Sequence, residues 1–260
     1  MVRGLDRFQK HFENYKDRYV LIGGVATWLT LDEAGLDARA TRDLDIVLCI
    51  EALDAEFAAH FWEFVRAGGY QVQEKSSGEK VFYRFCKPGQ GDYPEMLELF
   101  SRRPDELVLG DDSHLTPIPV AEDVSSLSAI LLDDVYYGFL HKNVTEKDGV
   151  SVIDERCLIP LKAKAWLDMT ERKANGDKVD SKEIRKHRND VLRLYQLLSP
   201  DTRIELPEAM ARDLSAFLAQ AGPDIDGNVL KGLNIKGVTP DEVTETIRRV
   251  FAVTQTGREE

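Results

Sequence analysis

The run DLDIVL at residues 43–48 constrains the fold more than any other part of the chain. Its alternating apolar side chains are typical of a β-strand with one face in a core, yet Asp43 and Asp45 share the other face. Neighbouring carboxylates repel, and burying them is costly unless a cation lies beside them. The run therefore predicts a cation site, or else a solvent-facing strand entrance where Arg39 or Arg42 pairs locally.

The segment YVLIGG at residues 19–24 predicts a strand that ends at two glycines, and the helical pattern of residues 25–35 follows it. Gly23 and Gly24 would let the backbone approach a ligand, and the first amides of the helix would face an anion. Tight strand-to-helix turns also use glycine where no ligand binds. However, this turn favours a phosphate and the next strand favours a metal ion, so the two together predict a metal–nucleotide site.

A hard divalent ion such as Mg²⁺ would satisfy Asp43 and Asp45 and would recruit substrate phosphates as further ligands. A third acid is available, because Glu98 interrupts the apolar, strand-like run EMLELFS at residues 95–101. Glu98 is therefore a candidate third metal ligand. The alternative is a glutamate on an edge strand that faces water.

The order of patterns predicts an α+β protein with two parts, residues 1–120 and a mostly helical remainder, residues 121–260. The expected helices are 5–17, 25–35 and 51–69, the expected strands are 19–24, 43–50, 70–75, 81–87 and 95–101, and residues 113–120 form a connector. From residue 121 onward helices are expected to dominate, with one strand at 149–154.

Composition narrows the setting of the protein. With 43% hydrophobic and 31% charged residues and no apolar run near the roughly 18 residues of a membrane helix, we expect no membrane partner. The N-terminus lacks an apolar signal-like core, and three scattered cysteines predict neither a disulfide framework nor a metal cluster, so we expect a cytoplasmic protein. A net charge of −12 excludes broad DNA coating.

Two helical segments of the second part add candidate residues. In residues 157–169, Lys162 falls within the apolar stripe and Lys164 on the opposite, polar side. An inward lysine is costly to bury unless its ammonium meets an anion or extends to water. Between Lys162 and Arg193 the sequence holds ten basic and six acidic residues, which fits a local phosphate site or a solvated helix face.

The next helix is predicted at residues 181–198, with Glu183 placed to complete a capping box on Asp180. His187 and Asp190 lie on or near its apolar stripe. A satisfied core histidine is the expected state of His187, without a chemical role. Asp190 could orient the inward lysine, accept a proton from an attacking hydroxyl, or form a structural ion pair. A solvated basic face is predicted for Arg185, Lys186 and Arg188.

The motif VLIGGVATWL…ARATRDLDIVL resembles the opening motif of the nucleotidyltransferase superfamily related to DNA polymerase β. It is most similar to AbiEii-type nucleotidyltransferases, which are toxins of bacterial toxin–antitoxin systems. The matching positions are Gly23, Gly24, Arg39, Thr41, Asp43 and Asp45. The resemblance implies a nucleotidyltransferase-type mixed sheet with flanking helices and a helical C-terminal lobe, in which Lys162 and Asp190 face the cleft.

The resemblance also implies a reaction, the transfer of an NMP from an NTP to a hydroxyl acceptor. Mg²⁺ would be held by Asp43, Asp45 and Glu98, while Lys162 neutralises charge on the phosphates. The phosphates would bind at the nucleotide-binding residues Gly23, Gly24 and Thr41.

Several acceptors and partners remain open from the sequence. RNA, such as the 3′ end of a tRNA, a protein side chain and a small molecule are all candidate acceptors, and the basic stretch favours RNA. A cognate antitoxin protein is a further candidate partner. The alternative from another class is a non-catalytic module that binds a nucleotide or a partner. A dinucleotide-binding fold is disfavoured, because GGVATW lacks the required glycine spacing.

Overall fold

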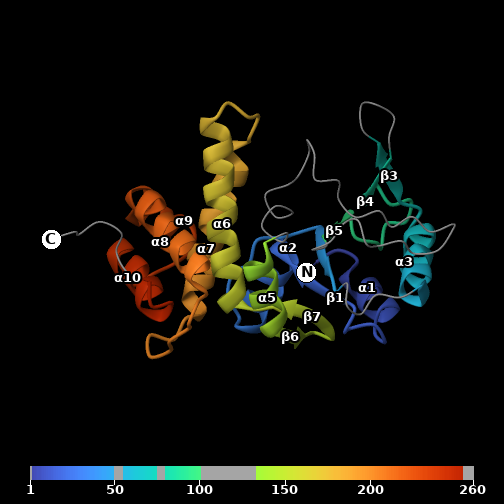
Figure 1. Ribbon diagram of the computed structural model, residues 1–260, viewed down its shortest axis with the longest axis horizontal. Helices are drawn as coiled ribbons and strands as arrows, with labels where there is room; N and C mark the ends of the chain where they lie inside the picture. The colour runs from blue at the N-terminus through green and yellow to red at the C-terminus, as the bar shows by residue number, and fades with distance from the viewer. Residues whose placement is uncertain (1, 50–54, 75–79, 101–132, 254–260) are drawn as a thin grey trace.

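One mixed β-sheet of seven strands forms the centre of the molecule, in the order β3-β4-β5-β2-β1-β7-β6 (Figure 1). The computed structural model describes residues 2–49, 55–74, 80–100 and 133–253. The strands are β1 (Tyr19–Ile22), β2 (Asp43–Leu48), β3 (Gln71–Glu74), β4 (Lys80–Cys86), β5 (Met96–Phe100), β6 (Val144–Lys147) and β7 (Val150–Ile153).

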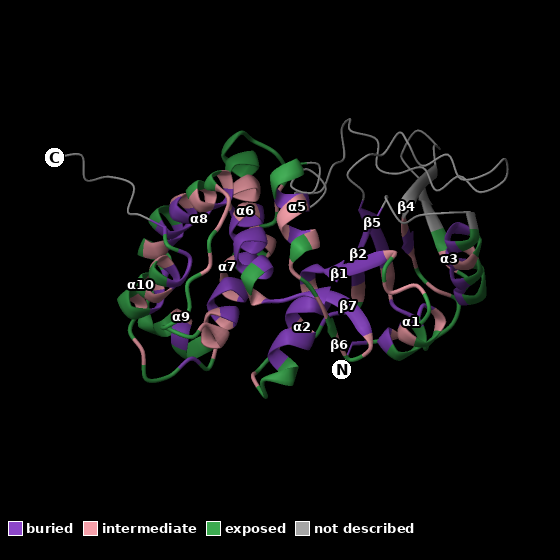
Figure 2. Cartoon of the chain, turned by 60° about the horizontal axis from the view of Figure 1, so that its bottom comes forward, coloured by how far each residue is buried: buried purple, intermediate pink, exposed green. Residues whose placement is uncertain are grey.

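The two central strands bring the first sequence motifs together. Strand β1 is buried along its whole length (Figure 2). It pairs antiparallel with β2, so that Ile22 lies opposite Asp45. Strand β2 pairs parallel with β5, which pairs antiparallel with β4. On β2 the side chains of Leu44 and Ile46 are buried, while Asp43 and Asp45 are partly buried on the opposite face. The predicted alternation of this strand is confirmed.

Helices cover the sheet and extend beyond it on one side (Figure 1). The helices are α1 (Leu5–His11), α2 (Gly23–Glu33), α3 (Ala55–Gly68), α5 (Asp134–Lys142), α6 (Glu155–Ala174), α7 (Ser181–Leu194), α8 (Glu208–Ala221), α9 (Gly227–Gly232) and α10 (Pro240–Val250), with 3₁₀ turns η3 (Tyr195–Leu197) and η4 (Gly222–Asp224). Helices α6 to α10 gather beside the sheet, and α1 lies next to α3 at its other end. Within the described ranges, no helix combines the length and the apolar character needed to span a membrane.

This architecture confirms the predicted α+β class with a mixed sheet and flanking helices, whereas its assignment to the nucleotidyltransferase type remains a prediction. Most predicted elements exist, with ends displaced by a few residues. The proposed division at residues 120 and 121, like the connector at 113–120, falls outside the described residues. Strands β6 and β7 come from beyond that division, yet β7 pairs parallel with β1 in the same sheet.

The first helix is shorter than predicted. It ends at His11 instead of residue 17, because Phe12 packs in the core and the chain then turns through Tyr15 to enter β1. Strand β7 confirms the strand predicted at residues 149–154, but β6 was missed. The two are joined by Asp148 and Gly149, both with positive φ, a dipeptide typical of tight hairpin turns.

The helical part corrects one further prediction and adds one contact. The carboxylate of Asp180 accepts a hydrogen bond from the Lys182 amide at 2.8 Å and caps α7 alone. Glu183 pairs with Lys186 at 2.8 Å, so the capping box is wrong. Lys164 lies on the side of α6 opposite Lys162, as predicted, but that side packs against α8, where Lys164 Nζ lies 3.4 Å from Asp213 Oδ2.

Candidate active site

Strand pairing gathers three carboxylates on one face of the sheet. Asp43 and Asp45 are two residues apart on β2, and the parallel register places Glu98 of β5 directly beside Asp45. Side chains at paired positions of neighbouring strands point to the same face. Glu98 lies on an interior strand and is 7% exposed, so it is not a glutamate on an edge strand facing water. The three predicted acids therefore meet at one place.

One further strand continues this row of charges. Arg84 of β4 lies opposite Glu98, and its Nη2 donates to Glu98 Oε1 at 2.6 Å. Glu98 thus has one cationic partner already, whereas Asp43 and Asp45 lie on the side of the row nearer α2. This partner could not be predicted from the sequence, because the register of β4 on β5 is not a local property of either strand.

The start of α2 lies against Asp45. Gly23 has a φ of +61°, and a Cβ added there would come within 1.8 Å of Asp45 Oδ2. The Gly24 amide donates to the same oxygen at 3.4 Å, so the positive end of α2 faces the carboxylate. A Cβ on Gly24 would lie 2.7 Å from Thr41 Oγ1. Both glycines are therefore required by close packing around the acids, whatever else binds there.

A buried ion pair lies on the helical side. Lys162 of α6 is 3% exposed and Asp190 of α7 is 1% exposed, and Lys162 Nζ lies 3.0 Å from Asp190 Oδ2. The other oxygen of Asp190 accepts from Arg193 at 3.3 Å. The inward orientation predicted for Lys162 is confirmed, and its anion within the protein is Asp190. Lys162 lines the same cleft as Asp45, and its positive charge opposes the rise in the pKa of Asp45.

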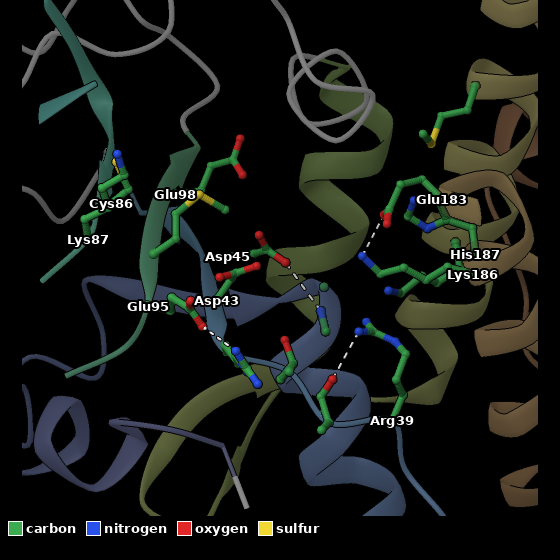
Figure 3. A pocket seen from close by; sticks show the side chains of 18 of the residues that line it. Arg39, Asp43, Asp45, Cys86, Lys87, Glu95, Glu98, Glu183, Lys186 and His187 are labelled. Carbon is green, nitrogen blue, oxygen red and sulfur yellow. Dashed lines mark hydrogen bonds and ion pairs between the residues drawn. The ribbon is translucent and has the colours of Figure 1, made fainter. Parts of the chain in front are cut away.

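A cleft of about 810 Å³ lies between the sheet carboxylates and a helical wall that includes Lys162. In Figure 3, Asp43, Asp45 and Glu98 project from the strands, while Lys186, His187 and Arg39 lie opposite them. The residues that line the cleft are Gly23, Gly24, Arg39, Ala40, Thr41, Arg42, Asp43, Asp45, Cys86, Lys87, Glu95, Met96, Glu98, Lys162, Met169, Arg172, Glu183, Lys186 and His187. The cleft is thus acidic on its sheet wall and mostly basic on its helical wall.

The ionisation of the sheet wall reflects this crowding. Burial, and then repulsion by Glu98, raises the pKa of Asp45 to about 7, although Lys162 and the Gly24 amide act in the opposite direction. Burial and the charge of Glu95 also raise the pKa of Asp43. The protein alone therefore leaves these carboxylates short of positive charge. A set of hard oxygen donors with that deficit fits a divalent ion such as Mg²⁺.

Two buried polar atoms opposite the acids have no hydrogen-bond partner among the described residues. Burial, and then repulsion by Lys162, lowers the pKa of His187 to about 3, so its imidazole is neutral. Its Nδ1 and the Nε of Arg39 are buried without a hydrogen-bond partner among the described residues. His187 is thus not the satisfied core histidine that the sequence predicted. Attraction to Lys162 and Arg39 outweighs burial at Asp190 and lowers its pKa, so Asp190 is ionised.

The structure brings most of the candidate residues together. Seven of them line the cleft, namely Gly23, Gly24, Thr41, Asp43, Asp45, Glu98 and Lys162. Asp190 does not line the cleft but lies behind Lys162 and holds its ammonium. The sequence analysis considered Arg39 only as a local ion-pair partner and as a motif position, and Lys186 only as part of a solvated face. Lys186 is three residues after Glu183 on α7, and this spacing could have indicated that the two side chains share one face of the helix.

No family model matches the chain, and no curated protein matches it. Among solved structures, it is similar to the crystal structure of an antigenic nucleotidyltransferase-like protein from Paracoccidioides brasiliensis. The similarity covers 93% of this chain and 98% of that chain, with 13% identity and a TM-score of 0.44. A similarity of this extent assigns neither a family nor an activity, so the resemblance to AbiEii-type proteins stays a prediction from the sequence motif.

Proposed function

We propose that the cleft binds a nucleoside triphosphate with Mg²⁺ and transfers its NMP group to a hydroxyl acceptor. The observation that carries this proposal is the strand register that places Glu98 beside Asp45, across the cleft from Lys162. A site with metal-type acids on one wall and cations on the other suits a polyphosphate, which carries both metal ligands and negative charge.

Each wall has its own part in the proposed reaction. Asp43, Asp45 and Glu98 would hold Mg²⁺, which supplies positive charge to the phosphates and to the attacking hydroxyl. The amides at Gly23 and Gly24 donate toward phosphate oxygens, because they open α2 at its positive end. Thr41 Oγ1 lies next to Gly24 and adds a hydroxyl donor. The catalytic contribution of the protein is positioning and electrostatics.

The helical wall would stabilise the leaving pyrophosphate. Lys162 faces the acids, and Asp190 fixes the direction of its ammonium through the 3.0 Å contact. Asp190 is therefore proposed as a positioning residue instead of the base that accepts the hydroxyl proton. Arg39 and Lys186 add charge at the same wall, and the unpartnered Nδ1 of the neutral His187 offers a hydrogen bond to the nucleotide.

The direct test is transfer of label from each α-³²P-labelled NTP to total cellular RNA or to lysate protein, with Mg²⁺ present. We expect Asp45→Asn to reduce transfer at least about 100-fold, because it removes a charged metal ligand. Asp92→Asn is the matched control, since Asp92 is exposed and pairs with Arg7 away from the cleft. Transfer by Asp45→Asn at the rate of the control would contradict the proposal.

The same assay addresses the acceptor. We propose RNA, with the 3′ end of a tRNA as the hydroxyl, because Arg172, Lys186 and Lys87 add positive charge to the lining of the cleft. If the label appears on protein or on a small molecule instead of RNA, the proposed acceptor is wrong but the proposed NMP transfer stands. Calorimetry with Mg²⁺ and each NTP, run beside an assay of pyrophosphate release, tests the non-catalytic alternative. That alternative predicts nucleotide binding without pyrophosphate release.

From the resemblance to AbiEii-type proteins we further propose a toxin that a cognate antitoxin neutralises. Expression of the chain in a bacterial host is then expected to arrest growth, and expression of Asp45→Asn is expected to be harmless. Equal growth arrest by both proteins would show that the arrest does not depend on the acidic residues of the cleft.

A further inference from the structure

Helices α1 and α3 lie side by side (Figure 1). A second group of ligand-type side chains comes from these two helices, outside the set of residues that line the cleft. His11 is the last residue of α1, and His60 and Glu63 are three residues apart on α3. One potential ligand atom from each of these side chains lies within 4.8 Å of the other two. The imidazole rings of His11 and His60 stack with centroids 3.9 Å apart and planes at 16°.

The hydrogen bonds of the two histidines fix where their protons are. His11 Nε2 lies 3.0 Å from the carbonyl oxygen of His60, and His60 Nε2 lies 2.6 Å from the carbonyl oxygen of His11. A carbonyl oxygen only accepts, so each Nε2 must carry a proton and donate it. Burial lowers the pKa of His11, and two stacked imidazolium rings would repel each other. In the neutral pair, each Nδ1 therefore bears a lone pair.

This protonation leaves acceptors facing one another. His60 Nδ1 lies 3.6 Å from Glu63 Oε2, and neither atom has a proton to donate when the imidazole is neutral. Two lone-pair atoms at this separation repel, and a cation between them removes the repulsion. The cation is either a second proton on His60 or a metal ion that also reaches His11.

We propose that His11, His60 and Glu63 form a binding site for a zinc-like divalent ion that joins α1 to α3. Two imidazole nitrogens and one carboxylate are a ligand set suited to Zn²⁺, with water in the fourth position, whereas Mg²⁺ prefers oxygen ligands. The crossed Nε2–carbonyl hydrogen bonds are of the kind that orient metal-bound histidines from behind. The proposal is independent of the activity of the cleft.

Binding requires a small local adjustment. Neighbouring ligands on tetrahedral Zn²⁺ lie about 3.4 Å apart. The ligand atoms here lie within 4.8 Å of one another, so the cluster has to contract by up to about 1.4 Å. A metal lies in the plane of each imidazole that binds it, so the rings of His11 and His60 must also tilt apart. The Glu63 side chain is 61% exposed and can move toward them.

The test is calorimetric titration of the full chain with ZnCl₂ in excess Mg²⁺, which occupies hard oxygen sites such as the cleft. We expect one Zn²⁺ per chain, at least tenfold weaker binding for Glu63→Gln and His11→Gln, and unchanged binding for Glu56→Gln. Glu56 is a matched control, because it is an exposed acid on the same helix that contacts Tyr15.

Two readouts keep the result interpretable. Glu63→Gln leaves both stacked rings in place, so loss of zinc in this variant is not a loss of fold, which its melting temperature in EDTA checks. Long-range ¹H–¹⁵N spectra should show the Nδ1 signals of His11 and His60 shifting as Zn²⁺ is added. Equal zinc affinity in all variants, or unshifted Nδ1 signals, would overturn the proposal and leave a protonated His60–Glu63 pair.

Discussion

A single missing Cβ at Gly23 allows the carboxylate of Asp45 to lie against the start of α2. The position needs glycine for two separate reasons, a φ of +61° and a clash in which an added Cβ would lie only 1.8 Å from Asp45 Oδ2. The sequence indicated the glycine but not its partner. Phosphate binding and carboxylate packing both call for glycine there, and only coordinates show the second requirement.

Gly23→Ala and Gly35→Ala separate these two reasons. Gly35 also has a positive φ, of +68°, but an added Cβ meets nothing within 4 Å. We expect Gly35→Ala to lower the free energy of unfolding by about 1 kcal/mol, from backbone strain alone. Gly23→Ala should cost at least about 3 kcal/mol in urea unfolding, because it also displaces Asp45. Equal losses would show that Asp45 yields without cost.

The buried ion pair between Lys162 and Asp190 links α6 to α7. Two residues of a helical pair, each almost fully buried, hold opposite charges at 3.0 Å. Breaking such a pair leaves an uncompensated charge, whereas replacing both partners by apolar residues is often neutral. Stability and catalysis can therefore be separated at this element.

We expect Lys162→Met to cost about 3 kcal/mol in urea unfolding and to abolish NMP transfer. The double variant Lys162→Met/Asp190→Leu should regain most of that stability and still fail to transfer, because the cation is missing. Lys164→Met on the same helix is the control, since its ion pairs are partly exposed and worth little. Recovery of transfer in the double variant would remove Lys162 from the reaction.

At the level of elements, the sequence predicted what depends on local periodicity. The alternation of β2 and the inward direction of Lys162 follow from periods of 2 and 3.6 residues, so both were found. The contact of Lys164 with α8 and that of Arg84 with Glu98 depend on which elements pack together, so both were missed. Glu98 was identified because an acid breaks an apolar run, but its place beside Asp45 required the register.

Over the whole molecule, the acidic wall makes ion-free stability depend on pH. Because the folded pKa of Asp45, about 7, lies above the ordinary aspartate pKa of 3.8, the folded state binds the extra proton between these values. Its contribution to stability is therefore fully present below about pH 4 and is lost as the pH rises through 7. Above pH 7 the ionised carboxylate is a cost that a bound cation would relieve.

We expect Asp45→Asn to melt at a higher temperature than the wild type in EDTA at pH 8, and the difference to shrink toward pH 5. Excess Mg²⁺ at pH 8 should stabilise the wild type and leave the variant unchanged. Asp92→Asn serves as the control, because the Arg7 guanidinium lowers the pKa of Asp92. A melting difference independent of pH between 5 and 8 would contradict the elevated pKa.

The pairing of β7 with β1 has a consequence for the order in which the protein is made. The ribosome synthesises β1 and β2 early. The other neighbour of β1 is β7, which is synthesised only at residues 150–153 and leaves the exit tunnel later still. Until then the nascent chain presents one open edge of an apolar strand, a surface that favours association with other chains. Chaperone capture is therefore expected to end when β7 emerges, which ribosome-stalled chains ending before and after this strand would reveal.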